Sequence, residues 1–451
     1  MPTIMTTTLT EYENYTSDYR ALQKRQENKT PSWLHDIRER GMNSFSELGL
    51  PTARRGNEKW KYTNVGPIAS ATFSYPADAS VDEATLAEIR RIAPLFAGST
   101  SIVFVNGQLS KSLSTLPNGA NGIRAMSLAE AILSGDEVVE RHLAKQASVE
   151  DDGFIALNTA FLYDGVFVHI PEGKSLESPL HLVFVSTEQE ESTVSHPRVL
   201  IVAGPNSKAT IIESYVGISQ NRYFTNAVTE IVLEEGAEID HHRLLMESEE
   251  SYHVGVARVY QSDNSKFSSK AFEKGPAIGR YDLSVLLDGP GSYCDLYGLY
   301  MTSGRQHMDN YINIDHAKPY GTSRLYYKGI LDGRSKAVFG GTVWVREGAI
   351  KTDSMQTDKN LVLSPNAEVD SKPALFIYAD DVKCGHGATA GNISEDTVFY
   401  MRSRGIDLET ASRLLIYGFA SEIIDTVRVD EFREYLENLF LNSLPNYKFE
   451  F

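Results

Sequence analysis

Cysteine is the rarest residue in this sequence: only Cys294 and Cys384 occur among 451 residues. Two cysteines cannot form the disulfide framework on which small secreted domains depend. They also cannot close a structural zinc or iron–sulfur site alone, because such a site needs about four ligands. We therefore expect a protein of a reducing compartment, with the cytoplasm as its location.

Long apolar runs and an excess of positive charge are missing as well. No stretch approaches the roughly 18 apolar residues of a membrane span. The first residues, MPTIMTTTLTEYENY, have neither the basic start nor the apolar segment of a secretory signal. The net charge is −17, from 43 Lys and Arg against 60 Asp and Glu. Because nucleic acids and anionic membranes are bound by clustered Lys and Arg, we expect neither as the main partner.

Common enzyme motifs are also absent. The stretch EGKS at 172–175 ends like a phosphate-binding loop. The first glycine of that motif would fall at Val168, however, and a strand rather than a helix is expected next. The patterns G-x-G-x-x-G after a strand, H-E-x-x-H and G-x-S-x-G do not occur. We therefore do not expect this stretch to bind ATP, and no enzyme class is indicated by a motif.

Sequence periodicity divides the chain into three regions. Residues 1–155 mix helix-like segments with one strand-like segment, TSIVFVNGQL, and predict a helical and α/β cap. Residues 156–392 contain β-branched, alternating segments such as GVFVHIP, LHLVFVST and AVTEIVLEEG, which are typical of strands. Residues 393–451 return to helical patterns, in which Ser394 and Asp407 are expected to be N-caps.

A turn signature recurs through the β-rich region. The steps between successive copies are 33, 30, 28, 27, 30, 27 and 18 residues. A step near 29 residues with two short strands per unit is typical of a β-solenoid, in which each coil stacks on the last. A β-sandwich would not keep this step. We attribute the short last step to a reshaped coil near the end of the stack. Each copy is a Gly or Asn followed by small or polar residues, at Gly173, Asn206, Gly236, Asn264, Gly291, Gly321, Gly348 and Asn366.

The stretch PTARRGNEKWKYTNV follows the first helical segments and is rich in basic and aromatic residues. Neither a helical nor a strand period is visible in it. We interpret it as a loop that ties the N-terminal helices to the body of the protein.

Two pairs of histidines are candidate metal ligands. His241 and His242 are adjacent in a predicted strand, so their side chains point to opposite faces and form a poor chelate. We interpret both as solvent-exposed. His307 and His316 lie nine residues apart beside acidic residues, and a metal site there is a weaker alternative.

The stretch ADDVKCGHGATAG places His386 two residues after Cys384. In an extended strand the two side chains share one face, with Cα atoms roughly 6.5 to 7 Å apart. That separation is too large for a reliable thiol–imidazole hydrogen bond, which disfavours a cysteine-protease couple. A purely structural role and a metal site completed by another chain both stay open.

The segment SKAVFGGTVWVREGAIKTDSMQTDKNLVLSPNAEVDSKPALFIYADDVKCGHGATAGNISEDTVFYMRSRGI resembles the C-terminal signature of the SufD family, part of the SUF iron–sulfur cluster assembly machinery. The resemblance is most specific in ADDVKCGHGATAG and FYMRSRGI and extends loosely through EKWKYTNV and FVNGQLS. The related SufB family is richer in cysteine and has a Cys-Asp-Ser stretch where this chain reads QTDKN, which favours SufD. Gly385 replaces the serine usual in the family, at a position that is not a ligand.

The resemblance implies a mainly β fold, a right-handed parallel β-helix (β-solenoid) flanked by an N-terminal α/β region and C-terminal helices. It implies a complex with a SufB-like paralogue and a SufC-like ATPase, which carries the only ATP site. His386 would face a cysteine of the SufB-like chain where a transient iron–sulfur cluster forms, with Cys384 beside it. No cofactor is then expected to bind the isolated chain stably.

The resemblance also implies that the C-terminal helical region, residues 393–451, contacts the SufC-like ATPase. The apolar stripes of its helices are typical of core, and docking of a partner is the alternative. Candidate partner-binding residues, wherever they are exposed, are Tyr417, Phe419, Phe432 and Leu436.

Two other classes of protein are alternatives. Many parallel β-helices are secreted enzymes that act on polysaccharides, so a carbohydrate-active enzyme is one of them. A stand-alone structural homodimer is the other. SufD-like chains can dimerise when SufB is missing, through the β-helix edge that otherwise pairs with SufB.

Overall fold

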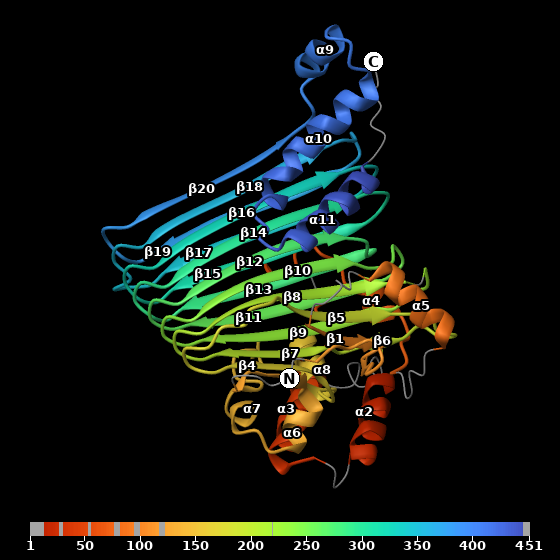
Figure 1. Cartoon of the computed structure of the whole chain (residues 1–451), viewed down its shortest axis with the longest axis vertical. Helices are drawn as coiled ribbons and strands as arrows, with labels where there is room; N and C mark the ends of the chain where they lie inside the picture. Colours follow the sequence, from red (N-terminus) through yellow and green to blue (C-terminus); the bar gives the residue numbers. More distant parts are fainter. Residues whose placement is uncertain are drawn as a thin grey trace, which may run out of the picture.

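The computed structural model describes residues 13–26, 30–52, 56–75, 82–93, 100–116, 122–218 and 220–444. Its body is a parallel β-solenoid built from two ten-stranded sheets that enclose one core (Figure 1). Sheet 1 contains, in spatial order, β2 (Gln108–Leu109), β1 (Thr100–Val105), β5 (Leu180–Ser186), β8 (Lys208–Gly217), β10 (Glu238–Met246), β12 (Lys266–Lys274), β14 (Tyr293–Thr302), β16 (Thr322–Leu331), β18 (Asp353–Val362) and β20 (Lys383–Gly391). Sheet 2 contains β3 (Arg124–Ser127), β4 (Gly165–Ile170), β7 (Arg198–Ala203), β9 (Phe224–Leu233), β11 (Tyr252–Gln261), β13 (Ile278–Leu287), β15 (His307–His316), β17 (Lys336–Val345) and β19 (Glu368–Ile377), with β6 (Val194–Ser195) paired to β9.

From β7 onward the chain alternates between the two sheets. From β9 onward each strand pairs in parallel with the strand two positions earlier in the chain, which belongs to the same sheet. Alternation along each strand sends one set of side chains inward and the other outward. On β16, for example, Leu325 and Tyr327 join the core, whereas Arg324 and Tyr326 face outward. The predicted parallel β-helix is confirmed.

The turns at one corner of the solenoid stack into a continuous column of hydrogen bonds. The left-handed backbone at Asn206 (φ 55°) and Asn264 (φ 54°) explains why Asn and Gly recur at these turns. Each turn donates a backbone N–H to the turn of the next coil. The donors are Gly173, Asn206, Gly236, Asn264, Gly291, Tyr320 and Lys351, and the last of them bonds to the carbonyl of Asp381.

The prediction of a reshaped last coil is wrong. The column passes through Tyr320 rather than Gly321 and through Lys351 rather than Gly348. Asn366 lies between β18 and β19 at the opposite corner, so it does not belong to the same series. The final coils therefore have the same length as the others. The 18-residue interval arises because Gly348 and Asn366 belong to turns at different corners of the solenoid.

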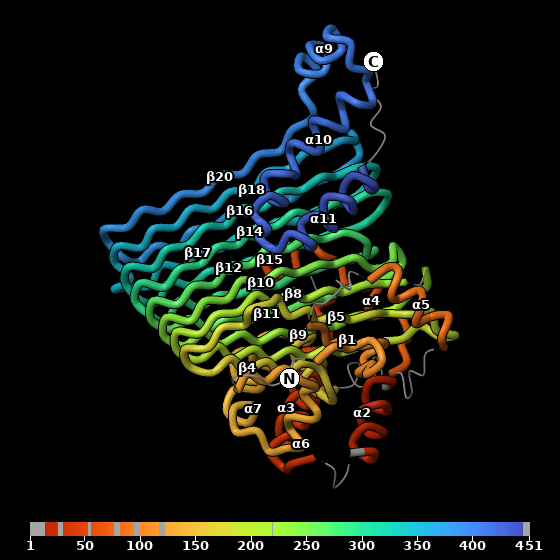
Figure 2. Tube along the Cα trace, in the orientation of Figure 1, coloured from red at the N-terminus to blue at the C-terminus, as the bar shows by residue number. Residues whose placement is uncertain are grey.

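The N-terminal region covers the first coils with helices, as Figure 2 shows at the red end of the trace. Helix α3 packs against the fully buried helix α8, and both contact the outside of sheet 2. The predicted strand TSIVFVNGQL forms β1 and β2, which are joined by a left-handed Asn106-Gly107 turn. The helices of this region are α2 (Glu13–Gln26), α3 (Ser32–Leu48), α4 (Gly66–Ser70), α5 (Glu83–Ile92), α6 (Leu128–Leu133), α7 (Glu137–His142) and α8 (Gly153–Ala160).

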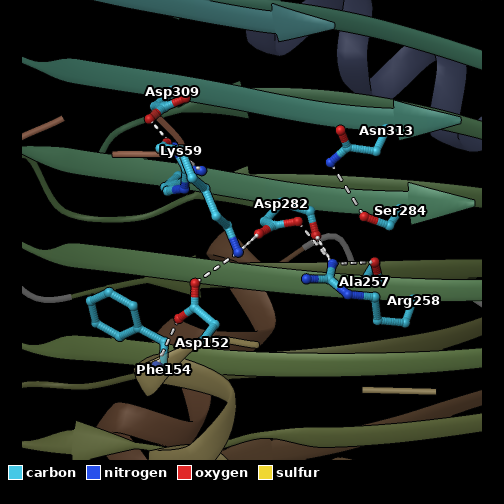
Figure 3. A network of polar contacts seen from close by, with 10 residues as sticks. Lys59, Asp152, Phe154, Ala257, Arg258, Asp282, Ser284, Asp309 and Asn313 are labelled. Carbon is cyan, nitrogen blue, oxygen red and sulfur yellow. Dashed lines mark hydrogen bonds and ion pairs between the residues drawn. The ribbon is translucent and has the colours of Figure 1, made fainter. Parts of the chain in front are cut away.

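Residues 58–63, which we call the strap, cross the outer face of sheet 2. Lys59 Nζ bridges Asp152 Oδ2 at 2.8 Å and Asp282 Oδ2 at 2.7 Å (Figure 3). Although burial disfavours its charge, the two carboxylates hold the pKa of Lys59 above its ordinary value. Glu58 reaches Lys372 of β19 with an ion pair at 2.6 Å. The strap therefore ties the N-terminal region to coils from the middle to the end of the solenoid. Residues 53–55 of the predicted loop lie outside the described residues.

Three C-terminal helices follow the solenoid: α9 (Glu395–Ser403), α10 (Leu408–Ile424) and α11 (Asp430–Ser443). Helices α10 and α11 lie over the outer face of sheet 1, whereas α9 projects beyond β20 and contacts α10 (Figure 1). Ser394 and Asp407 cap α9 and α10 by accepting from Thr397 N and Thr410 N, as predicted. Within the described residues, none of the helices combines the length and the apolar character that a membrane crossing requires.

Candidate functional site

The solenoid is open at its C-terminal end. Strands β19 and β20 close the two sheets, and among the described residues each pairs with only one neighbour, β17 or β18. An edge strand of this kind presents backbone N–H and C=O groups that a strand of another chain can pair with. The other end of the stack is covered by the N-terminal helices.

Cys384 and His386 both lie on the inward side of β20, as their spacing predicts. Cys384 is in register with Ser354 and His386 with Gln356, and both partners on β18 are buried in the core. Because no further coil covers β20, Cys384 is only half-buried and His386 is exposed. Burial raises the pKa of the Cys384 thiol, which the backbone of Ser354 partly offsets. The thiol is therefore protonated at neutral pH until a metal or base takes its proton.

The second cysteine cannot help the first to bind a metal. Cys294, Ser323, Ser354 and Cys384 occupy one register column, so the two cysteines lie three strand spacings apart, roughly 14 Å. Cys294 is also fully buried. Among the described residues, no three His, Cys, Asp or Glu side chains are grouped so that they could hold a metal ion.

A polar layer lies directly beneath β20. Asp358 Oδ2 accepts from Asn360 Nδ2 at 2.8 Å and from Ser371 Oγ at 2.6 Å. The Tyr300 hydroxyl donates to Asn360 Oδ1 at 2.5 Å. Burial raises the pKa of Asp358 to about 6, although the hydrogen bonds from Ser371 and Asn360 oppose the shift. The last covered layer of the core therefore contains a carboxyl group that ionises close to neutral pH.

The histidine pairs lie elsewhere. The interpretation of His241 and His242 as solvent-exposed is wrong, because both are buried. His241 faces inward and bonds to Ser269, while His242 faces outward and lies beneath Phe432 of α11, at a ring-centroid distance of 5.6 Å. The strand pattern gives no sign that a C-terminal helix covers that outer face.

His307 and His316 are bound in hydrogen-bond networks of the solenoid. His307 Nε2 lies 3.0 Å from the hydroxyl of Thr63 in the strap. His316 Nε2 lies 2.9 Å from Ser323 Oγ in the core. The two rings are on opposite faces of β15, since His316 is inward and His307 contacts the strap outside the solenoid. They do not form a common site.

The four candidate partner-binding residues of the C-terminal helices differ in exposure. Phe432 and Leu436 of α11 are buried against sheet 1, so they belong to the core of this chain. Tyr417 and Phe419 of α10 are partly buried at the same packed interface. The expectation of partner binding applied only to exposed members of the set, and it is therefore restricted to the accessible parts of Tyr417 and Phe419.

Sequence reasoning missed the most exposed apolar residues of this region. Phe399 and Tyr400 of α9 are 75% and 58% exposed, and Leu414 of α10 is 50% exposed. Phe399 and Tyr400 belong to the motif FYMRSRGI, whose two adjacent aromatics on a short helix could have indicated a surface role. Three large apolar side chains left in water on neighbouring helices are typical of a protein-binding surface.

The fold and the site together define a β-solenoid protein whose open last coil carries a thiol and an imidazole. Two family models match the chain: the SufBD protein N-terminal region at 9–182, and the SufBD core domain of SUF system iron–sulfur cluster assembly at 184–419. The chain belongs to the SufBD family, and it acts in iron–sulfur cluster assembly of the SufBD type.

Related proteins agree with the family match. An iron–sulfur cluster assembly SufBD family protein of Synechocystis is 32% identical over 404 residues, covering 88% of both chains. The iron–sulfur cluster assembly protein SufD of Escherichia coli is 31% identical over 385 residues, covering 84% of this chain and 86% of its own. SufD of Bacillus subtilis is 24% identical over 418 residues, covering 91% and 94%. The predicted resemblance to SufD is confirmed, and these relatives give no support to a carbohydrate-active enzyme.

Proposed function

We propose that this chain is a scaffold subunit, not an enzyme, and that it shares a site for a nascent iron–sulfur cluster with a SufB-like paralogue. The observation that carries this proposal is the position of His386 on an edge strand whose inward face is open. A neutral imidazole is a competent iron ligand. Cys384 and His386 provide two ligands at most, so a partner strand must bring the remaining ones.

Pairing at the open end would supply those ligands directly. A partner strand added beside β20 would run about 4.8 Å from it and place its own inward residues opposite Cys384 and His386. The cluster would then lie between two solenoids whose cores become continuous. A second copy of this chain could use the same edge when the paralogue is absent, which would give a homodimer.

The C-terminal helices are proposed to bind a SufC-like ATPase. Phe399, Tyr400 and Leu414 provide exposed apolar anchors, and Tyr417 and Phe419 of α10 are partly accessible. Aromatic side chains in such positions contribute strongly to binding interfaces. ATP would then act only through the partner.

Co-expression with a SufB-like and a SufC-like chain tests the proposal. We expect one stable complex, in which iron–sulfur maturation depends on His386. A complex that assembles and matures clusters normally with His386→Ala would refute the ligand role. Failure of the three chains to associate would refute the scaffold role.

A further inference from the structure

Nearly all buried carboxylates of the described residues form an ion pair with a buried or partly buried Lys, Arg or His. Eight Asp and Glu residues of the described chain are buried, and seven of them form an ion pair with Lys, Arg or His. Asp358 is the exception: its hydrogen-bond donors, Asn360 and Ser371, are both neutral. Leaving a buried carboxylate without a positive partner is costly. The seven pairs are Asp152 and Asp282 with Lys59, Glu213 with His241, Glu230 with Arg198, Glu247 with His253, Glu273 with Arg243, and Asp309 with Arg280.

Two oxygen atoms in this layer lack a partner although they are buried. Asp358 Oδ1 receives no hydrogen bond, and neither does Oε1 of Gln356, whose Nε2 donates to Gly341 O at 3.0 Å. Both side chains have 0% exposure. Both unpartnered atoms are acceptors, so the group that satisfies them is a donor or a cation.

In sheet 1, only β20 lies between these oxygens and the open end. Strand β20 is the last strand of sheet 1 and places only the small, exposed residue Ala388 over Asp358. His386 stands directly over Gln356 in the register. A small ion entering from the open end would therefore pass an imidazole at the mouth and meet a carboxylate and an amide oxygen below it.

We infer that Asp358 and Gln356, together with His386, form a binding site for a divalent transition-metal ion such as ferrous iron in the last coil. The inference rests on the proposed function, since it takes His386 as a ligand. It extends that function by assigning oxygen ligands from the core of this chain, so that an ion can be held before the sulfide and the partner's ligands arrive. Oxygen and imidazole donors suit divalent iron, whereas a cluster requires sulfur.

Anaerobic titration of the full-length chain with Fe²⁺, and with Co²⁺ as an absorbing substitute, tests this site. We expect one weakly held ion per chain, because three ligands leave coordination positions to water. Asp358→Asn keeps the size of the side chain and should weaken binding by about tenfold or more. Gln356→Glu adds a second carboxylate and should strengthen it. Asp315→Asn, on a partly exposed carboxylate of β15 paired with Arg346, is the matched control and should not change the affinity for the ion.

The outcomes separate this inference from the proposed function. Equal affinity in the wild type and Asp358→Asn, or no ion bound by the wild type, overturns the inference. If Asp358→Asn instead weakens association with the SufB-like chain, the missing cation is a basic side chain of the partner, and the inference is again overturned. Cluster maturation in a His386→Ala complex tests the proposed function alone, and its result does not depend on the comparison of Asp358→Asn with Asp315→Asn.

Discussion

His386 is exposed within its own chain, so its imidazole buries little apolar surface there. His386→Ala should therefore leave folding and complex formation nearly intact. Maturation of clusters should fall strongly, because alanine offers no ligand. Cys384→Ala should have a milder effect if the imidazole is the principal ligand and the thiol its neighbour. The yield of assembled complex and the rate of iron–sulfur maturation should be measured together for both variants.

A purely structural pair would give the opposite pattern. His386→Ala would then reduce solubility or association with the SufB-like chain, while the activity of each assembled complex would stay at the wild-type level. Normalising maturation to the amount of complex separates the two patterns.

His196 should make stability depend on pH. It is stacked on Phe161 at 4.9 Å between ring centroids, and burial lowers its pKa to about 3 from an ordinary value of 6.5. Between about pH 6.5 and pH 3, the His196 imidazole therefore binds a proton in the unfolded chain but stays neutral in the folded chain. Stability from this residue is complete above pH 6.5 and falls by about 1.4 kcal/mol per pH unit as the pH drops through that window.

Urea unfolding at several pH values, for the wild type and His196→Phe, measures this contribution. The variant keeps an aromatic ring in the stack but cannot titrate, so its stability should fall less steeply between pH 6.5 and 4. Equal slopes for the two proteins would show that His196 is not a source of acid sensitivity.

At the scale of elements, the strap should stabilise the solenoid through Lys59. Among the described residues, Lys59 is the one basic group that pairs with Asp152, and Lys59→Met removes it, whereas Asp282 retains Arg258 at 2.8 Å. We expect a loss of about 3 kcal/mol in the free energy of unfolding, since a buried carboxylate is left without its partner. Lys372→Met breaks the exposed contact between the strap and β19 and should leave the urea midpoint almost unchanged. Similar losses in both variants would contradict this ranking.

Substitutions in the C-terminal helices should distinguish residues that pack against sheet 1 from residues that bind a partner. Phe432→Asp places a charge at a position with 0% exposure and should detach α11 from sheet 1, which thermal unfolding would detect. Phe399→Asp and Leu414→Asp change exposed residues, so the fold should persist while binding of the SufC-like ATPase is lost. Unchanged affinity for the ATPase in both surface variants would place the docking surface elsewhere.

These elements also show what the sequence could predict. The caps at Ser394 and Asp407 and the left-handed turns at Asn206 and Asn264 are local, so the residues that cause them stand beside them in the chain. The burial of His242 and Phe432 depends on α11 folding back over strands nearly two hundred residues earlier. The unpaired state of Asp358 could not be predicted either, because the absence of a base is a property of the whole core layer.

At the scale of the whole molecule, the isolated chain should purify colourless and without stoichiometric iron. The described residues hold no group of three or more His, Cys, Asp or Glu ligands, so a cluster cannot be closed within one chain. Iron analysis and visible absorption after anaerobic purification check this expectation. A stable brown chromophore on the single chain would contradict the shared site.

The composition of β20 also affects the tendency of this exposed edge strand to aggregate. The strand reads KCGHGATAG, with three glycines, one β-branched residue and no large apolar side chain. Gly387 and Gly391 have no neighbour within 4 Å that would require their small size inside this chain. Exposed edges rich in Val and Ile are templates for fibrils, whereas a glycine-rich edge gives little side-chain adhesion to an arbitrary strand. The open edge of sheet 1 therefore offers an arbitrary strand little to adhere to, and selective pairing there depends on a partner whose side chains match it.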